Sequence, residues 1–509
     1  MGTHRAVVIG AGTAGLTAAS TLASNGLDVT VVERAEGPGG KMREIIVGSR
    51  PIDSGPTVFT MRWVFDDLFE ALGERLEDHL TLRPLDTLAR HAWTDGSRLD
   101  LFTDEEQSVD AIGGFAGRTD AEGFRAFIAD ARKIFEVLKS PFICAAEPSM
   151  MMLLRSSGFR DLTAIKPFQA LWKALGSYFS DPRLRQLFGR YATYCGSSPF
   201  DAPATLMLVA HVERAGVWLI DGGMYQLART LADVAVRRGA RLRYGCDVSS
   251  IMVTAGRAAG VRLANGERIE ADIVVATADV AAIAQGLFGG DATNAVPGIP
   301  ETARSLSAIT WSCVGTTSDF PLLHHSVFFS RDYRAEFDSI FRRGQMPIEP
   351  TVYVCAQDRD DTAAAPSSPE RLFILINAPA IGDRHQFEPA EISQCTQRTF
   401  AMLMRCGLAV TTMPEFTKVT TPTDFNRMFP GTGGALYGRS SHGWMASFQR
   451  PGARSKLPGL YLAGGSTHPG PGVPMAALSG RMAAASAIAD FGSTARFRTT
   501  DMRGGMSTR

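Results

Sequence analysis

The stretch that decides the fold lies close to the N-terminus, where residues 6–15 read AVVIGAGTAG. Its first four residues are the apolar run of a buried β-strand, and a helical stretch follows the glycines. Gly10 permits a tight turn, Gly12 lets the backbone approach a pyrophosphate, and Gly15 allows the helix to pack closely on the strand. The N–H groups at the start of the helix would face this anion. The pattern predicts a βαβ unit that binds a dinucleotide.

A second strand and an acidic residue complete this unit. Residues 28–32 read DVTVV, which indicates a strand, and Glu33 follows directly. At the end of such a strand a carboxylate accepts hydrogen bonds from the ribose of the dinucleotide. Asn25 and Gly26 are typical of the end of the intervening helix. We therefore expect an α/β fold of the Rossmann type.

Two features favour FAD over NAD as the dinucleotide. Small and basic residues follow the ribose-binding strand at Gly39, Gly40, Lys41 and Arg43. Far along the chain, residues 460–465 read as a strand that ends in glycines, and residues 470–475 lead into a helix over 476–488. The start of a helix that lies at the cofactor stabilises the negative charge that a reduced flavin develops.

The middle of the chain contains further strands. Residues 241–244 and 272–277 each indicate a strand, and residues 248–269 between them indicate a β-meander with Ala-Gly and Asn-Gly turns. We expect all of these strands to extend the N-terminal sheet. The dinucleotide-binding domain would then be assembled from three separate segments of the chain.

Composition and charge exclude several classes of protein. The 509 residues include 52 Lys plus Arg and 52 Asp plus Glu, and 45% of residues are hydrophobic against 20% charged. This neutral, apolar chain is neither a disordered tail protein nor a nucleic-acid binder. Its seven scattered cysteines form no C-x-x-C pair, so we expect no metal site. No signal peptide and no apolar window of about 18 residues is visible, so we expect a cytoplasmic protein with peripheral membrane contact.

A family resemblance is carried mainly by the C-terminal stretch. Residues 461–474 read YLAGGSTHPGPGVP, and the landmarks at 181–186 (DPRLRQ) and 216–224 lie between this stretch and the N-terminal motif. With these motifs the chain resembles the bacterial and fungal type of carotenoid desaturase, the phytoene desaturase family of FAD flavoproteins, over about residues 5–490. Residues 51–65 (PIDSGPTVFTMRWVF) are most similar to the hydroxycarotenoid 3,4-desaturases, or methoxyneurosporene dehydrogenases, of purple phototrophic bacteria.

The resemblance implies how the chain is divided. It implies a Rossmann-like FAD-binding domain of the amine oxidase/GDP dissociation inhibitor type, with a substrate-binding domain and a helical insertion. We expect the FAD-binding domain to comprise residues 1–80, 220–290 and 455–490, and the substrate-binding domain residues 81–135 and 291–454. Residues 136–219 would be the insertion, and residues 491–509 a flexible tail.

The residues expected to bind FAD come from the motifs and from the resemblance together. They are Gly10, Gly12, Gly15, Glu33, Gly39, Gly40, Lys41, Gly55, Pro56, Thr57, Val248, Gly464, Gly465, Gly472, Val473, Pro474 and Met475. His468 is the one histidine singled out for chemistry, because it lies in the C-terminal signature, and a structural role in the turn is the favoured alternative.

The resemblance implies that two hydrogens are removed across C-3,4 of an acyclic 1-hydroxy- or 1-methoxycarotenoid. Hydride passes to the flavin and a proton is lost, so no dedicated catalytic base is required. One alternative is a phytoene desaturase that acts earlier in the same pathway, and another is a non-enzymatic prenyl-lipid carrier of the same fold. The turn at 467–470 disfavours a flavin amine oxidase. The electron acceptor, oxygen or a quinone, and the oligomeric state remain open.

A carotenoid partitions into lipid, so the resemblance also implies that the protein acts on its substrate at the inner face of a bacterial membrane. Residues 167–179 predict a helix with an apolar, aromatic face, and residues 151–190 contain seven cations against two carboxylates, a net charge of +5. We expect this helix to lie in the membrane interface, and the alternative is a buried helix of the substrate-binding part. The face consists of Phe168, Leu171, Trp172, Leu175 and Phe179.

Overall fold

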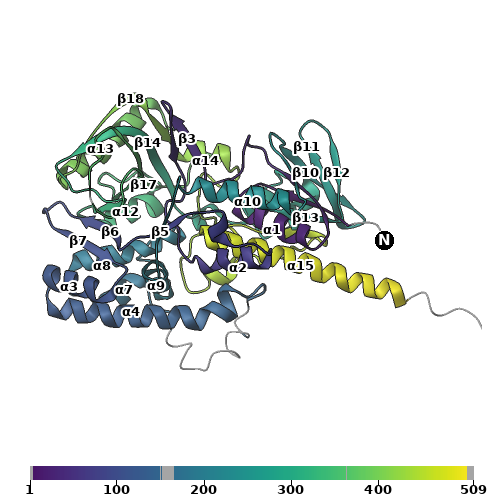
Figure 1. Ribbon diagram of the computed structural model, residues 1–509, viewed down its shortest axis with the longest axis horizontal. Helices are drawn as coiled ribbons and strands as arrows, with labels where there is room; N and C mark the ends of the chain where they lie inside the picture. Colours follow the sequence, from purple (N-terminus) through teal and green to yellow (C-terminus); the bar gives the residue numbers. More distant parts are fainter. Residues whose placement is uncertain (1–3, 149–150, 152–164, 363, 501–509) are drawn as a thin grey trace, which may run out of the picture.

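The computed structural model describes residues 4–148, 151, 165–362 and 364–500, with backbone only for 492–500. Strands and helices that are far apart in the sequence form two halves of one elongated molecule (Figure 1). One half contains a parallel sheet flanked by helices, and the other half contains a large, mostly antiparallel sheet with helices beneath it. Within these residues, no helix combines the length and the apolar character that crossing a bilayer requires.

The parallel sheet contains the N-terminal motif and has the strand order β19-β13-β1-β2-β9. All four pairings are parallel, and Ile9 at the end of one central strand is in register with Val32 at the end of the next. Helix α1 (Thr13–Ser24) packs against α10 (Tyr225–Arg237) and α15 (Val473–Thr500). This confirms the predicted βαβ unit. The strands are β1 (Arg5–Ile9), β2 (Asp28–Val32), β9 (Arg241–Arg243), β13 (Ile273–Ala276) and β19 (Leu460–Leu462).

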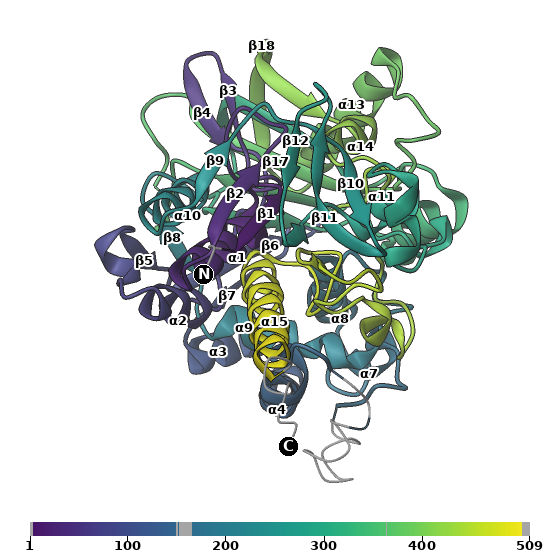
Figure 2. The ribbon, with the colours of Figure 1, turned by 90° about the vertical axis from the view of Figure 1, so that its right-hand side faces the viewer.

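The predicted β-meander does not extend this sheet, so that expectation was wrong. The meander forms a separate antiparallel sheet of β10 (Val248–Thr254), β11 (Arg257–Leu263) and β12 (Arg268–Glu270). Figure 2 shows β1 and β2 between α10 on one side and this small sheet on the other. Ile251 and Val261 share an apolar core with Val7 and Val274 of the parallel sheet. The meander therefore covers a face of the parallel sheet, while β9 and β13 extend this sheet as predicted, β9 at one edge and β13 between β1 and β19.

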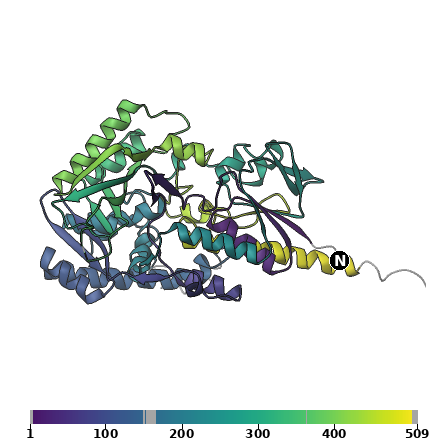
Figure 3. The same ribbon diagram turned by 45° about the horizontal axis from the view of Figure 1, so that its top comes forward.

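The large sheet has the strand order β18-β14-β17-β16-β15-β6-β7 and joins residues 87–102 to residues 307–420. Helix α13 (Pro389–Arg405) lies on one side of this sheet and the helices of residues 105–214 lie on the other (Figures 1 and 3). The division of the chain into domains stays a prediction. The strands are β6 (Thr87–Ala92), β7 (Arg98–Phe102), β14 (Ser307–Ser318), β15 (His325–Phe328), β16 (Val352–Ala356), β17 (Glu370–Ala378) and β18 (Ala409–Thr420).

Shorter elements connect the two halves. Two-stranded sheets pair β3 (Glu44–Val47) with β4 (Arg50–Asp53) and β5 (Leu82–Pro84) with β8 (Trp218–Ile220). The helices on the lower side of the large sheet are α3 (Glu105–Ala116), α4 (Arg118–Leu138), α7 (Leu171–Leu175), α8 (Pro182–Gly189) and α9 (Leu208–Arg214). Further α-helices within the described residues are α2 (Trp63–Ala71), α11 (Val280–Ala284), α12 (Tyr333–Phe337) and α14 (Pro422–Met428).

The helix predicted over 167–179 is shorter than expected and is not interfacial. Only α7 is helical there, and Leu171, Leu175 and Phe179 are fully buried. The ring of Phe179 stacks on Phe188 at a centroid distance of 4.7 Å, because this face packs against α8 rather than facing solvent. The buried alternative therefore describes these residues. Of the predicted face, only Phe168 is strongly exposed, with 79% of its surface accessible.

The C-terminal helix is longer than predicted. We expected a helix over 476–488 and a flexible tail from 491, whereas α15 begins at Val473 and ends at Thr500. Figure 1 shows its last turns extending beyond the parallel sheet. Residues 491–500 of the expected tail are therefore helical, its flexibility stays a prediction, and residues 501–509 lie outside the described residues.

Candidate functional site

The carboxyl ends of the parallel strands open into a cavity of about 1140 Å³, called here the dinucleotide cavity. A residue directly after each strand or a few positions beyond it lines the cavity: Gly10 after β1, Glu33 after β2, Cys246 after β9, Thr277 after β13 and Gly464 after β19. Ligands of open α/β sheets bind at this edge. The cavity thus lies where the N-terminal motif predicts a bound dinucleotide.

The three glycines of the motif have different surroundings. A Cβ atom on Gly10, which has φ +101°, would lie 2.4 Å from Oγ1 of Thr277, and one on Gly15 would lie 2.0 Å from the carbonyl oxygen of Gly10. A Cβ atom on Gly12 would meet nothing closer than 3.9 Å, the carbonyl oxygen of Gly39. Gly10 and Gly15 are therefore required by the turn and by helix packing. Gly12 instead leaves space in the cavity that a side chain would fill.

Glu33 is buried and its carboxylate is fixed by backbone groups. Oε2 accepts a hydrogen bond of 2.8 Å from the N–H of Ala11, and Oε1 accepts one of 2.8 Å from the N–H of Ala35. A carboxylate oxygen has two lone pairs, so each oxygen retains one for a further donor. The carboxylate is therefore held in place with capacity for the hydroxyl groups of a ribose.

Two cations are held by backbone carbonyls, Lys41 in the lining of the dinucleotide cavity and Arg450 in that of a neighbouring cavity. Nζ of Lys41 donates a hydrogen bond of 2.7 Å to the carbonyl oxygen of Leu436, and Arg450 donates one of 2.9 Å to that of Gly465. Burial lowers the pKa of Lys41, against the attraction of Asp279, and burial lowers the pKa of Arg450 to about 10. The hydrogen bonds of both side chains within the described residues go to backbone carbonyls and not to carboxylates. Their charges are thus available to an anionic ligand.

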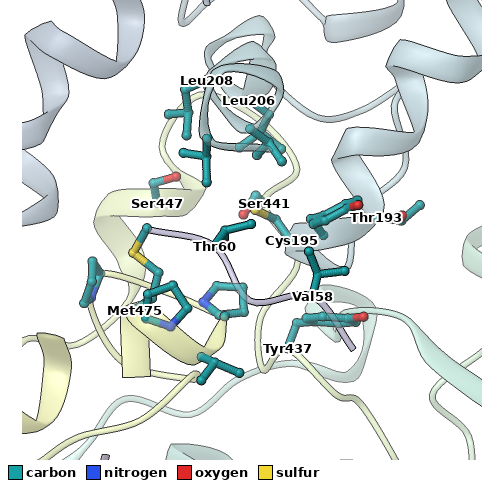
Figure 4. Close-up of a pocket in the computed structure, with 18 of the residues that line it drawn as sticks. Val58, Thr60, Thr193, Cys195, Leu206, Leu208, Tyr437, Ser441, Ser447 and Met475 are labelled. Atoms are coloured by element: carbon teal, nitrogen blue, oxygen red, sulfur yellow. The ribbon is translucent and has the colours of Figure 1, made fainter. Parts of the chain in front are cut away.

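A second cavity of about 370 Å³ adjoins the first, and we call it the apolar cavity. Figure 4 shows Leu206 and Leu208 at one end of it and Tyr437 at the other. Most of its lining is hydrophobic, and Val209 and Val212 of α9 line it together with Leu206 and Leu208. The two cavities share part of their wall. A long apolar ligand in the apolar cavity would therefore reach a ligand bound in the dinucleotide cavity. The shared residues include Gly55, Pro56, Tyr437, Pro471, Gly472 and Val473.

The structure brings most of the predicted FAD residues together at the dinucleotide cavity. Thr57, Pro474 and Met475 line only the apolar cavity, and Gly15 lines neither, because it lies beneath the glycine-rich turn. The predicted residues that line the dinucleotide cavity are Gly10, Gly12, Glu33, Gly39, Gly40, Lys41, Gly55, Pro56, Val248, Gly464, Gly465, Gly472 and Val473.

His468 is buried away from the lining of both cavities. Its Nε2 lies 2.9 Å from the carbonyl oxygen of Phe142, and its ring contacts that of Phe142 edge-on. Burial lowers the pKa of His468 to about 4, so the imidazole is neutral near pH 7. The geometry gives His468 a structural role, which was the favoured alternative at the sequence level.

Sequence reasoning missed a polar group on the wall of the apolar cavity. Arg190 and Tyr194 both line this cavity, and the Tyr194 hydroxyl donates a hydrogen bond of 2.7 Å to Glu213. From the sequence, Arg190 was only one of the cations in a basic segment. The available signal was its position in an otherwise apolar and aromatic run, residues 187–195 (LFGRYATYC).

Comparison with known proteins identifies the family. The profile described as "Flavin containing amine oxidoreductase" matches residues 13–488. The chain belongs to this family. Within it, the chain is 53% identical to the hydroxyneurosporene desaturase of Rubrivivax gelatinosus, over 100% of this chain and 97% of that protein. It is 46% identical to the hydroxyneurosporene desaturase of Cereibacter sphaeroides, over 97% and 99% of the two chains.

Solved structures with low sequence identity to this chain have the same fold. An oxidoreductase from Methanosarcina mazei superposes with a TM-score of 0.60 at 16% identity, over 94% of this chain and 99% of that chain. A putrescine oxidase superposes with a TM-score of 0.57 at 14% identity, over 96% and 99%. These likenesses confirm the predicted fold class.

Proposed function

We propose that the protein is an FAD-dependent desaturase that introduces a C-3,4 double bond into an acyclic 1-hydroxy- or 1-methoxycarotenoid. The observation that carries this proposal is the shared wall between the dinucleotide cavity and the apolar cavity. A long hydrocarbon in the apolar cavity would meet the cofactor at this wall. The high identity to proteins named hydroxyneurosporene desaturase supports the choice of substrate.

The residues of the dinucleotide cavity fit FAD. Gly12 leaves room beside the start of α1 for a pyrophosphate, Glu33 retains lone pairs for ribose hydroxyls, and Lys41 contributes a positive charge. When bound, FAD supplies a hydride acceptor. Val473, the first residue of α15, lines both cavities, so the positive end of the helix dipole faces the place where they meet. This end stabilises negative charge there.

The apolar cavity contributes orientation and the exclusion of water. Leu206, Leu208 and Val212 form an aliphatic surface against which the carotenoid chain would pack. The hydrocarbon of the substrate can therefore move from lipid into this part of the cavity without burying an unpaired polar group against it. Holding the reacting bond in one orientation removes much of the entropic barrier to its oxidation. Proton loss from the activated chain then restores a neutral, extended polyene, and no side chain is needed as a dedicated base.

We also propose that the mouth of the apolar cavity lies on the cytoplasmic face of the inner, photosynthetic membrane. Pro167 and Trp444 line the cavity, and the neighbouring Phe168 contacts Trp444 with ring centroids 5.1 Å apart. The exposed fractions are 79% for Phe168, 44% for Trp444 and 37% for Met445. An exposed aromatic pair beside an apolar opening suits a membrane interface, from which a carotenoid would enter without crossing water.

A vesicle assay tests the proposed activity. Purified FAD-loaded protein is mixed with vesicles that contain either 1-hydroxyneurosporene or phytoene, under air or with an added quinone, and the products are separated by chromatography. We expect a new double bond in the hydroxylated carotenoid. Desaturation of phytoene alone would instead identify the earlier enzyme of the pathway. Protein that stays colourless and gains no thermal stability with FAD would support the prenyl-lipid carrier.

A further inference from the structure

The apolar cavity has a guanidinium group in its wall. Arg190 is the first residue of the 3₁₀ helix η3 (Arg190–Cys195), which follows α8. It lines the cavity together with Thr193, Tyr194 and Cys195 from the same turn, and aliphatic side chains of α9 line the cavity as well. A charged group in such surroundings is costly unless it is paired or binds a ligand.

The partners of Arg190 stabilise its positive charge but occupy few of its N–H donors. Nη2 of Arg190 donates a hydrogen bond of 3.2 Å to the hydroxyl of Tyr194, which in turn donates one of 2.7 Å to Glu213. The hydroxyl of Tyr191 also donates to Glu213. Burial opposes the charge of Arg190, but attraction to Tyr194 and Glu213 outweighs it and raises the pKa of Arg190 above its ordinary value. The group therefore stays a guanidinium.

Most of the hydrogen-bonding capacity of Arg190 remains available. A guanidinium has five N–H donors, and within the described residues Tyr194 is the one acceptor that takes a hydrogen bond from Arg190. The side chain retains accessible surface, and it lines the apolar cavity. Glu213 already accepts hydrogen bonds from two tyrosine hydroxyls. The group of this cluster that is available to a ligand in the cavity is therefore the guanidinium of Arg190, with its charged N–H donors.

We propose that Arg190 binds the oxygen on C1 of the carotenoid and thereby selects substrates with an oxygenated end group. This inference rests on the proposed function. The hydrocarbon of an acyclic carotenoid has no hydrogen-bond acceptor, so a guanidinium in the wall distinguishes chains by their oxygen atoms alone. The guanidinium only donates hydrogen bonds. It can therefore bind a hydroxyl or a methoxy group, because the oxygen of either group accepts through its lone pairs. A site built for such an oxygen leaves its donors unpaired when the oxygen is missing.

The position of Arg190 relative to the cofactor fits this role. C1, which carries the oxygen, is separated from C3 by one methylene carbon, so a donor to this oxygen has to lie close to the wall where the bond is oxidised. Tyr437 belongs to the wall that the two cavities share, and burial raises the pKa of its hydroxyl to about 12, which the charge of Arg190 opposes only in part. Gly196, which directly follows η3, lies against Tyr437, since a Cβ atom on Gly196 would be 2.6 Å from the tyrosine ring. The turn that carries Arg190 therefore contacts the wall where the two cavities meet.

The test compares one carotenoid pair in wild type and variants. The kcat/KM is measured for 1-hydroxyneurosporene and for neurosporene, which lacks the oxygen, in the same vesicles. Wild type should favour the hydroxylated carotenoid, and Arg190→Met should lower this preference at least about tenfold, mainly through KM, because a hydrogen bond from a charged donor is lost. Arg190→Lys should retain part of the preference. Lys173→Met, which removes an exposed cation on α7, should leave it unchanged.

Binding separates this inference from the proposed activity. Quenching of tryptophan fluorescence by each carotenoid is titrated in parallel, and flavin content and melting temperature verify that each variant is folded. Loss of selective binding in Arg190→Met without turnover by wild type would uphold the inference and overturn the proposed function. Turnover by wild type with an unchanged preference in folded Arg190→Met and Arg190→Lys would overturn the inference and leave the function standing.

Discussion

The backbone N–H of Ala11 donates a 2.8 Å hydrogen bond to Oε2 of Glu33. This contact joins the glycine-rich turn after β1 to the end of β2, and the second oxygen of the carboxylate is fixed by Ala35. The two walls of the dinucleotide cavity are therefore held together by the same side chain that is predicted to bind ribose. Such preorganisation reduces the entropic cost of binding the cofactor.

Glu33→Ala should weaken FAD retention by roughly tenfold to a hundredfold, since hydrogen bonds to a charged group contribute about 1.5–3 kcal/mol. Glu33→Gln keeps one oxygen acceptor and should lose less. The measurement is flavin absorbance per polypeptide after gel filtration, with Glu270→Ala at the exposed end of β12 as a control. Equal flavin content in Glu33→Ala and the control would count against the proposed cofactor pocket.

Substitutions at Gly12 and Gly15 should fail in different ways. Gly12→Val places its side chain in open space of the dinucleotide cavity, so FAD retention should fall while the melting temperature of the FAD-free protein stays near that of wild type. Gly15→Val drives Cβ into the carbonyl oxygen of Gly10, so the FAD-free protein itself should be strongly destabilised. Calorimetry and flavin content of both variants check this. Retention of normal flavin by Gly12→Val would contradict the assignment of this space to the cofactor.

Glu336 should give the protein a pH-dependent stability. This buried carboxyl accepts hydrogen bonds from the N–H and hydroxyl of Thr351 and from Asn377, and burial raises its pKa to about 7. Between its unfolded value near 4.5 and about 7 the folded protein holds the extra proton. The contribution of Glu336 to the free energy of unfolding therefore falls as pH rises, by up to about 1.4 kcal/mol per pH unit.

Glu336→Gln removes this titration. The free energy of unfolding of the variant relative to wild type should therefore increase with pH from about 5 to 7 and level off above that range. Denaturant unfolding at several pH values measures the difference. Buried histidines such as His91, whose pKa is lowered to about 3 by burial, act in the opposite direction, but they are common to both proteins and cancel. A difference that does not vary with pH would contradict the raised pKa.

The sequence predicts the cofactor half of the molecule well because its signals are local. The turn at Gly10, the packing at Gly15 and the carboxylate of Glu33 follow from residues only a few positions apart, and each has the conformation or contact that its spacing implies. The strand β19 and the helix α15 were recognisable for the same reason, since glycines separate an apolar run from a helical one.

The features that were predicted wrongly or missed depend on which surfaces of the folded chain pack against each other. Leu171 and Phe179 are apolar at helical spacing whether they face lipid or α8, so periodicity alone does not distinguish the two environments. The same ambiguity explains why the predicted meander was assigned to the wrong sheet, because its alternation indicates a half-buried sheet but not the surface against which it packs. Arg190 was overlooked because its chemistry comes from the apolar wall around it, which residues distant in the sequence provide.

Phe168 and Trp444 should anchor the protein to lipid. Both rings are exposed at the rim of the apolar cavity, and burying them in the interfacial region of a bilayer releases ordered water without straining the fold. The double variant Phe168→Ser with Trp444→Ser should bind anionic vesicles several-fold more weakly in co-sedimentation. Activity towards carotenoid in vesicles should fall in parallel, whereas FAD content should be unchanged, because neither residue lines the dinucleotide cavity.

Met413→Ser is the matched control for this membrane contact. Met413 is 51% exposed, but it lies on β18, at the opposite side of the molecule from α7 in Figure 1. Removing its apolar surface should leave vesicle binding as in wild type. Equal losses in the control and in the double variant would mean that exposed apolar area anywhere on the surface drives adsorption. A selective loss in the double variant would place the membrane at the mouth of the apolar cavity, where a carotenoid has the shortest path from lipid to the reacting wall.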